Sequence, residues 1–494
     1  MQQSIYDPGF VAFGGGSTQT VAHPVAMAAL SVAVLLIVLL PRKYLGIPVF
    51  LGLLLIPGGQ NFYLDGFHFY FHRLVVMAGC IRMLCSGLLA PSKLLPGGFR
   101  TLDKLFIAWA IFHASAQTLQ FMAWGGVLNQ VAFLWEAIGG YFLFRWLIQD
   151  EEDVQRVLKV FAVVALVATS GMVYEQVTKQ NLFGFLGGIR LVPEIRNGKI
   201  RSQGIFQHSL LAGSFGATML PMFLWLWKRG QSWFLGLLGI VLCVVMIFTA
   251  STSTPIMALI GGIFAICLWP LRIWMRPLRW SIVMMLVGLH LVMKSPVWFL
   301  LAHIDLSGGS NGYHRAMLID TSIKHFGEWW LIGTHSNGNW GWDMWDSANQ
   351  FITEAVSGGI VTLICFITMF VLCFRMIGNA RKAVEGDRKK EWLFWLLGAA
   401  LFTQLMAYFG VDYFDQMKYV WYSLLAIISA ATFPILATKT FPALQSDMAI
   451  SDPRLDYAYP LPSREVLASR IGHADSRPAA GGDTRGTQGT FPKL

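Results

Sequence analysis

The side chains best suited to chemistry lie in a long segment between two apolar runs, at about 294–349 and the start of the following run. In chain order they are Arg315, His335, Asp346 and Glu354. An imidazole or a carboxylate could take a proton from an attacking hydroxyl, and an arginine could bind an anion. A connector that only joins two helices needs about 2–8 residues. The segment therefore predicts a functional site and not merely a linker.

A second segment, at about 177–206, carries an excess of positive charge. Its basic residues include Arg190, Arg196, Lys199 and Arg201. The planar guanidinium fork binds two phosphate oxygens at once and stays charged at ordinary pH. The segment predicts a cationic site for a phosphorylated substrate, and a solvated basic loop is the alternative interpretation.

Several charged residues fall inside apolar runs, where an unpaired charge is expensive, and three of them could pair or face the site. They are Arg73, Arg82 and Glu136. We expect Arg73, near the end of its run, to face the site. Arg82 lies about 13.5 Å further along the same helix, and we expect it to pair with Glu136.

Two further groups of residues have competing interpretations. The tryptophans of the long segment could stack on sugar rings or lie at the membrane surface as an aromatic belt. These are Trp329, Trp330, Trp340, Trp342 and Trp345. Asp412 and Asp415, in a short connection near the end of the apolar region, are interpreted as helix caps.

The elements that must position these residues follow from composition. Of the 494 residues, 55% are hydrophobic and only 13% are charged, whereas a soluble domain carries about 25% charged residues. Apolar runs of about 20 residues recur, and each is long enough to cross a bilayer. This composition argues against a soluble enzyme, a nucleic-acid-binding protein and a disulfide-stapled secreted domain. It predicts an all-α polytopic membrane protein with about 12–14 transmembrane helices.

The spans and the distribution of charge predict a topology. Most of the 37 Lys and Arg residues fall on one side of the spans, so we expect the N-terminus outside and the C-terminus inside. Residues 1–437 form the predicted transmembrane domain, and 438–494 a disordered cytoplasmic tail. The candidate spans lie near 21–40, 45–58, 67–89, 105–124, 127–148, 159–176, 207–227, 233–250, 253–270, 279–293, 350–374, 391–410 and 419–437.

The two segments, each with the span that follows it, resemble the O-antigen ligase and Wzy-type polysaccharide polymerase superfamily. The resemblance covers about 150 residues, between 201 and 360. It rests on the run RSQGIFQHSLLAG, with Arg201, Gly204 and His208, and on Arg315 followed by a helix, a glycine turn with Gly333 and Gly338, then Asn349, Glu354, Gly358 and Gly359. Where the family usually has a His before this Asn, the chain has Ala348.

The resemblance implies a GT-C-like membrane glycosyltransferase with a large periplasmic loop. It would use an undecaprenyl-diphosphate-linked oligosaccharide at the periplasmic face of the bacterial inner membrane, with inversion and without a metal ion or cofactor. The partners implied are a polysaccharide or lipid acceptor, membrane lipids, a chain-length regulator and a flippase, and no nucleic acid. The implied catalytic residues are Arg315, His335 and Glu354, with His335 as first choice of base, and the implied substrate-binding residues are Arg201, Arg190, Arg196, Arg73, His208 and Asn349.

Three functions fit these features. The first is polymerisation of lipid-linked repeat units in exopolysaccharide or O-antigen biosynthesis. The second is an O-antigen ligase, which uses the same donor chemistry with a different acceptor. The third, from another class, is a transporter or flippase of lipid-linked sugars, although transporters often show related halves and interrupted spans. The concentration of reactive residues on one face favours an enzyme.

Overall fold

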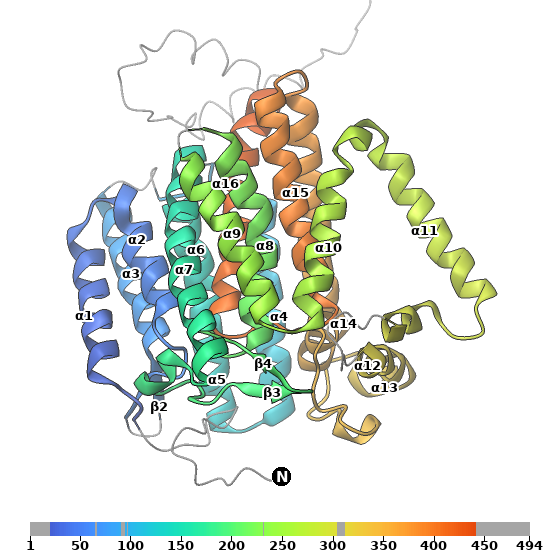
Figure 1. The fold of residues 1–494 in the computed structure, drawn as a ribbon, viewed down its shortest axis with the longest axis horizontal. Coiled ribbons are helices and arrows are strands. Elements are labelled where there is room, and N and C mark those ends of the chain that lie inside the picture. Colours follow the sequence, from blue (N-terminus) through green and yellow to red (C-terminus); the bar gives the residue numbers. More distant parts are fainter. Residues whose placement is uncertain are drawn as a thin grey trace, which may run out of the picture. The chain divides into compact units, whose positions relative to one another are not determined.

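The structure is a computed structural model that describes residues 20–64, 67–89, 94–95, 97–230, 232–303 and 312–440. Within these residues the chain is all-α, with sixteen α-helices and two short antiparallel hairpins (Figure 1). The α-helices are α1 (Pro24–Leu39), α2 (Arg42–Leu55), α3 (Phe71–Leu89), α4 (Thr101–Phe121), α5 (Trp124–Leu134), α6 (Gly140–Leu147), α7 (Glu151–Thr178), α8 (Ser209–Lys228), α9 (Trp233–Thr249), α10 (Ser253–Cys267), α11 (Met275–Val292), α12 (Gly312–Lys324), α13 (Phe326–Trp329), α14 (Gln350–Ala383), α15 (Arg388–Tyr408) and α16 (Gln416–Thr440).

Shorter elements join these helices. The strands are β1 (Asn61–Leu64), β2 (Phe67–Tyr70), β3 (Glu194–Arg196) and β4 (Lys199–Arg201). A π-helical turn, η2 (Trp135–Gly139), lies between α5 and α6, and the 3-10 helices are η3 (Leu182–Leu186), η4 (Trp269–Trp274), η5 (Val297–His303) and η6 (Gly338–Trp340).

The long apolar runs form helices, as the sequence predicts. Every predicted span contains an α-helix, so the all-α prediction is confirmed. Among the described residues, seven helices are long and apolar enough to cross a membrane by length and composition, and α1, α9 and α10 are shorter apolar helices. The helices of a multi-pass membrane protein would have these properties. From residue 441 on, the predicted tail lies outside the described residues.

The start of the third predicted span is not helical. Residues 67–70, which we expected to be helical, form β2 and pair with β1 in the register Asn61↔Tyr70 to Leu64↔Phe67. The run Phe-His-Phe-Tyr is rich in aromatic residues, which favour strands. The helix therefore begins at Phe71, so His72 and Arg73 lie in its first turn.

The most enclosed of the long helices are α8 and α16. About 83% of the apolar window of α8 and 67% of that of α16 is buried. Helix α8 packs against α9, α10 and α15, and α16 packs against α6 and α14. Both helices begin at the end of the bundle where the hairpins lie, so the connections that precede them are held by the most buried part of the fold.

Helix α11 is the exception to this packing. None of the apolar window Trp269–Val292 is buried, and Figure 1 shows α11 standing apart from α10. Exposed apolar side chains such as Met284, Val287 and Leu291 cover its surface. In a bilayer this surface would be solvated by lipid, which is why its exposure need not be costly.

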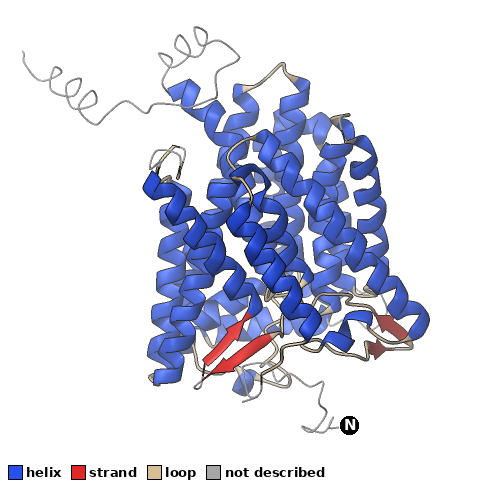
Figure 2. Cartoon of the chain, turned by 90° about the vertical axis from the view of Figure 1, so that its left-hand side faces the viewer, coloured by secondary structure: helices blue, strands red, loops and turns tan. Residues whose placement is uncertain are grey.

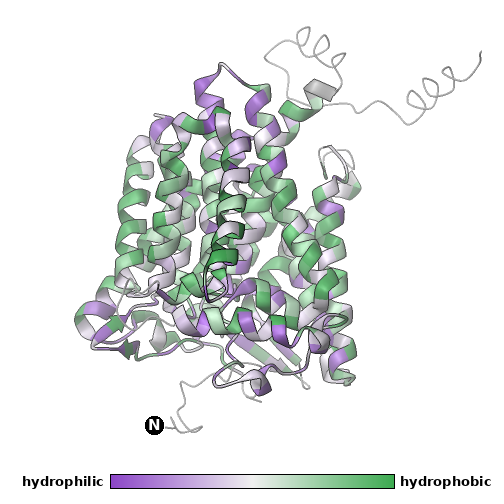
Figure 3. Ribbon diagram, turned by 90° about the vertical axis from the view of Figure 1, so that its right-hand side faces the viewer, coloured by the Kyte–Doolittle hydropathy of each residue, from purple (hydrophilic) through white to green (hydrophobic). Residues whose placement is uncertain are grey.

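The irregular segments collect at one end of the long helices, named here the loop side. It holds β1–β4, η5, α12 and α13 (Figures 1 and 2). Figure 3 shows hydrophobic residues along the long helices and hydrophilic residues concentrated at their ends. The two long segments of the sequence analysis therefore meet on the loop side.

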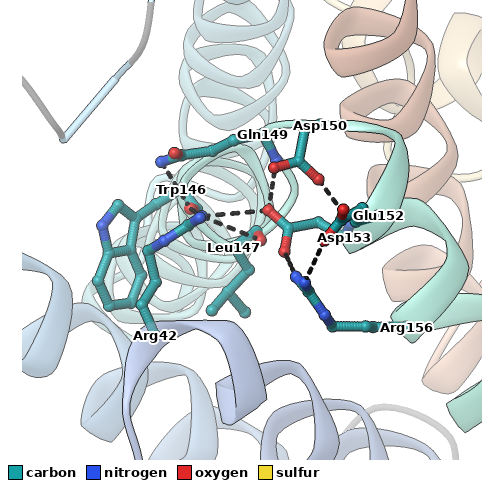
Figure 4. Close-up of polar contacts among 8 residues, drawn as sticks. All are labelled: Arg42, Trp146, Leu147, Gln149, Asp150, Glu152, Asp153 and Arg156. Carbon is teal, nitrogen blue, oxygen red and sulfur yellow. Dashed lines mark hydrogen bonds and ion pairs between the residues drawn. The ribbon is translucent and has the colours of Figure 1, made fainter. Parts of the chain in front are cut away.

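A network of hydrogen bonds and ion pairs lies at the opposite end of the long helices (Figure 4). The Arg42 guanidinium, at the start of α2, donates to the Trp146 carbonyl (3.1 Å) and to Asp153 (3.3 Å). Arg156 forms an ion pair with Asp153 and, at 2.8 Å, with Glu152. These contacts hold the ends of α2, α6 and α7 together. Arg42 and Arg156, at this end of the helices, both pair with Asp153.

Candidate functional site

Arg315 is the central residue of the candidate site. It lies in the first turns of α12 with only 8% of its surface exposed. Its Nη2 donates to the Thr254 hydroxyl of α10 at 2.6 Å, and that hydroxyl donates to the Gly410 carbonyl at 3.1 Å. A Cβ at Gly410 would lie 2.9 Å from the guanidinium carbon, so glycine leaves room for the arginine.

One nitrogen of this guanidinium is unused. The Arg315 Nε is buried and has no hydrogen-bond partner among the described residues. A buried donor without a partner costs free energy that an incoming acceptor would restore. Because the donor belongs to a cation, the acceptor that fits best is an anion.

The hairpin β3–β4 supplies further cations. Its turn is Asn197–Gly198, with positive φ values of 50° and 74°, as a two-residue hairpin turn of this type requires. The register sets Glu194 opposite Arg201. Their side chains form an ion pair at 3.2 Å, so the hairpin holds Arg201 in place.

His208 adjoins this ion pair as the N-cap of α8. Its Nδ1 accepts a hydrogen bond from the Leu210 backbone N–H at 3.1 Å. The proton of a neutral ring is then on Nε2, which lies 3.8 Å from Glu194. Burial lowers the pKa of His208 to about 4, Glu194 opposes this, and Arg190 and Arg201 lower it further. At neutral pH His208 is therefore a neutral cap and adds no charge.

Four arginines share one electrostatic environment, named here the arginine cluster: Arg190, Arg196, Arg201 and Arg315. Burial lowers the pKa of Arg315 to about 10, Arg201 and Arg196 lower it further, and Asp346 opposes them. These residues come from segments more than 100 positions apart in the sequence. Mutual repulsion of this kind is relieved when an anion binds.

One carboxyl group, that of Asp346, interacts with Arg315 of the cluster, and a second, that of Asp412, interacts with Asp346. Burial raises the pKa of Asp346, against the opposing effects of His314 and Arg315. Burial also raises the pKa of Asp412 to about 7, with Asp346 adding to the rise. A carboxylate that exchanges a proton near neutral pH is suited to general base catalysis.

The connection Gly410–Asp415 holds Asp412 in this position. The Tyr413 backbone N–H donates to Gln350 at 2.6 Å, and Gly410 is held by Thr254. Sequence analysis interpreted Asp412 only as a helix cap, because nothing local to it in the chain carries a chemical motif. Its proximity to Asp346 arises from tertiary structure.

Glu354, a predicted catalytic residue, is enclosed within α14. Its carboxylate accepts hydrogen bonds from Trp109 (2.9 Å) and Gln350 (2.8 Å) and lies 3.5 Å from His113. It therefore contacts the site indirectly, through Gln350 and the backbone of Tyr413.

The structure places His335 and Asn349 outside the arginine cluster. His335 is exposed, and its ring lies 4.5 Å from that of Phe121. Asn349 is buried and caps α14 by accepting from the Phe351 and Ile352 backbone N–H groups (3.0 and 3.3 Å). The contacts described for these two residues include none to the four arginines.

Arg73 belongs to a second group, named here the glutamate cluster: His72, Arg73, Glu136 and Lys418. The Glu136 carboxylate is 2.6 Å from His72, 2.9 Å from Arg73 Nε and 2.6 Å from Lys418. The prediction that Arg82 pairs with Glu136 is wrong. Glu136 meets the first turn of α3, and Arg82 lies about 13.5 Å further along that helix.

The loop tryptophans divide between two roles. Trp329 and Trp340 are buried in a small core with Leu318 and Met344. Trp342 and Trp345 are 89% and 71% exposed and lie on either side of Asp343 in the chain. The first pair is therefore structural, whereas the second pair and Trp330, which is 45% exposed, are open to a ligand.

Within the described residues, no group of three or more His, Cys, Asp and Glu side chains is arranged to hold a metal ion. Comparisons of the chain with protein-family models and with curated proteins found no match.

Proposed function

We propose that the chain is a membrane glycosyltransferase that polymerises undecaprenyl-diphosphate-linked oligosaccharide repeat units for exopolysaccharide or O-antigen biosynthesis. The observation that carries this proposal is the buried, unpartnered Nε of Arg315 within the arginine cluster. A diphosphate leaving group gains negative charge in the transition state, and fixed cations stabilise that charge.

The residues support a single displacement. The acceptor hydroxyl oxygen forms a bond to the anomeric carbon of the donor, and the bond from that carbon to the diphosphate oxygen breaks. The lipid diphosphate leaves with the bonding electrons and is stabilised by Arg315 and Arg201. The hydroxyl proton passes to the Asp412 carboxylate. One displacement inverts the anomeric centre, and the arginines supply the charge that a metal ion would otherwise supply.

The exposed indoles of Trp342 and Trp345 suit the sugars of the substrate. Aromatic faces combine an apolar surface with a polar edge, and both side chains are on the segment that carries Asp346. We assign them to contact with the glycan. The proposal also includes a GT-C-like fold of about 12–14 transmembrane helices, with the loop side periplasmic, the C-terminus cytoplasmic and the protein in the bacterial inner membrane.

The test uses the purified full chain in lipid nanodiscs with undecaprenyl-diphosphate oligosaccharide. Mass spectrometry would measure released undecaprenyl diphosphate and glycan length. We expect both products from the native chain and neither from Arg201→Ala. Lys324→Ala, which removes an exposed cation on α12, is the matched control and should stay active. Folded protein that releases no lipid diphosphate from native repeat units would overturn the proposal.

The same assay separates the alternatives. A ligase would release lipid diphosphate only when a different lipid acceptor is added, and the glycan would not lengthen. A transporter or flippase would move labelled lipid across a vesicle membrane with no release of diphosphate. We favour a transferase over a transporter, because the arginine cluster and Asp346 lie together on the loop side.

A further inference from the structure

An apolar cavity of about 510 Å³ lies between α3 and the α5–η2–α6 helix. Its lining includes Cys80 and Leu84 from α3, and Trp135 and Ile138 from η2. The volume falls within the range of about 300–1,000 Å³ that is usual for small-molecule sites. These apolar side chains can pack against a hydrocarbon chain but provide few hydrogen-bond partners for a polar ligand.

Arg73 lies on the same face of α3 as this cavity. Cys80 and Leu84 follow Arg73 by seven and eleven residues, close to two and three turns of helix. The cavity is also close to the glutamate cluster along the α5–η2–α6 helix. Trp135 and Ile138, which line the cavity, lie on either side of Glu136 in η2. One face therefore presents a polar group at the loop side and an apolar cavity deeper along the helix.

The N–H groups of the glutamate cluster outnumber the hydrogen bonds that the Glu136 carboxylate can accept. Three groups converge on Glu136, and among the described residues Arg73 donates through Nε and Nη1, the latter to the His68 carbonyl at 3.3 Å. The Tyr419 hydroxyl, 1% exposed, has no partner among the described residues. Donors remaining on Arg73, Lys418 and Tyr419 could serve a second anion.

The other titratable groups facing the cluster include Asp415, Tyr70 and Tyr422. Burial raises the pKa of Asp415, against Lys418 and His72, and burial also raises the pKa of Tyr70. Arg73 lies over the Tyr70 ring at 5.0 Å. Asp415 and the tyrosines therefore form part of the electrostatic surroundings of Arg73 and Lys418.

We infer that the cavity and the glutamate cluster bind the polyprenyl diphosphate of the acceptor glycan, with the chain in the cavity and the diphosphate at Arg73 and Lys418. This inference rests on the proposed function, in which two lipid-linked glycans meet. The hydroxyl that attacks lies one repeat unit away from its own diphosphate, so donor and acceptor diphosphates need separate sites. The segment Val411–Lys418 connects the two regions, since Asp412 interacts with Asp346, which is beside Arg315, and Lys418 belongs to the glutamate cluster.

The test is photo-crosslinking of the full chain in nanodiscs with undecaprenyl diphosphate that carries a diazirine on its chain. We expect crosslinks to α3 and to η2–α6. Leu84→Trp, which fills the cavity, should lower these crosslinks by about tenfold, equivalent to about 1.4 kcal/mol. Ile81→Trp is the matched control, because Ile81 lies on α3, is 54% exposed against 56% for Leu84, and does not line the cavity.

The outcomes separate this inference from the proposed function. Crosslinks that are absent from these helices, or unchanged in Leu84→Trp, overturn the inference even if the enzyme releases diphosphate. Crosslinks that are lost when excess phosphatidylglycerol is added, but not excess undecaprenyl diphosphate, identify a phospholipid site and overturn it as well. If the crosslinks are found but no lipid diphosphate is released in the activity assay, the lipid site stands and the proposed function fails.

Discussion

The arginine cluster and the glutamate cluster hold similar cations but differ in what balances them. Around Glu136, three basic side chains share a buried carboxylate that belongs to the protein. Around Arg315, the described side-chain hydrogen bond goes to the Thr254 hydroxyl, and one buried N–H has no partner among the described residues. The first group is built around an anion of the protein, whereas Arg315 in the second group has no carboxylate among its described hydrogen bonds.

This difference follows from position. Glu136 lies within helices, where an unpaired charge is expensive and must find a partner in the protein. The arginine cluster lies among the loop-side segments, and Arg315 within it is buried with its described side-chain hydrogen bond going to a hydroxyl and not to a carboxylate. Replacing Glu136 should therefore mainly lower stability, whereas replacing Arg315 should mainly lower activity.

The largest effect on stability is expected from Glu136→Ala. The change leaves Arg73 and Lys418 without their shared counter-charge, and breaking a buried pair in this way costs about 3–5 kcal/mol. Thermal unfolding of the purified protein would measure the fall in midpoint. Glu385→Ala removes an exposed carboxylate and should leave the midpoint unchanged. An equal midpoint in both variants would show that the glutamate cluster is not a structural ion group.

Arg315→Ala should lower activity strongly without lowering stability. We expect the release of lipid diphosphate to fall by about 10²–10³-fold, as when a donor that stabilises the transition state is removed. The unfolding midpoint should be unchanged or higher, because the variant loses a desolvated cation that makes one hydrogen bond, to Thr254. Kinetic assay and thermal unfolding would be run on the same preparation. A loss of stability as large as that of Glu136→Ala would assign Arg315 a structural role.

The dependence of the reaction rate on pH tests the proposed role of Asp412 as the base. With the pKa of Asp412 at about 7, the fraction of active base should rise as pH increases through 7, giving an acidic limb to the pH–rate profile. Asp412→Asn should remove most activity together with this limb. An unaltered limb in that variant would assign the titration to another group.

The same raised pKa has a defined sign for stability. The folded state binds the Asp412 proton more tightly than the unfolded state, so ionisation costs stability as pH rises from about 4 through 7. Asp412→Asn should therefore stabilise the protein above pH 7 and have little effect near pH 4. Unfolding midpoints at the two pH values would measure this difference, and a variant less stable at pH 8 than the native chain would contradict it.

The sequence predicts much of this arrangement, and the failures have physical causes. Apolar runs predict the helices because burial and lipid contact depend on composition. Excess positive charge in one loop predicts Arg201, and the reactive residue types of the other loop predict Arg315. Contacts that depend on tertiary structure are missed, as for Asp412, whose neighbours come from distant segments. The pairing of Arg82 with Glu136 fails because helix depth cannot be judged from span boundaries alone. The hairpin β3–β4 had an overlooked signal, since Asn197–Gly198 lies between two short alternating runs.

The smallest effect on activity is expected from His335→Ala, and this variant tests which residue acts as the base. His335 is exposed and contacts Phe121, with no described contact to the arginine cluster. Surface substitutions of this kind change free energies by about 0.5 kcal/mol, so activity should stay within about twofold of the native value. Steady-state rates of His335→Ala and Asp412→Asn would be compared at pH 8, where Asp412 is ionised. If His335→Ala lost as much activity as Asp412→Asn, the turn that carries His335 would have to close onto the arginine cluster during the reaction.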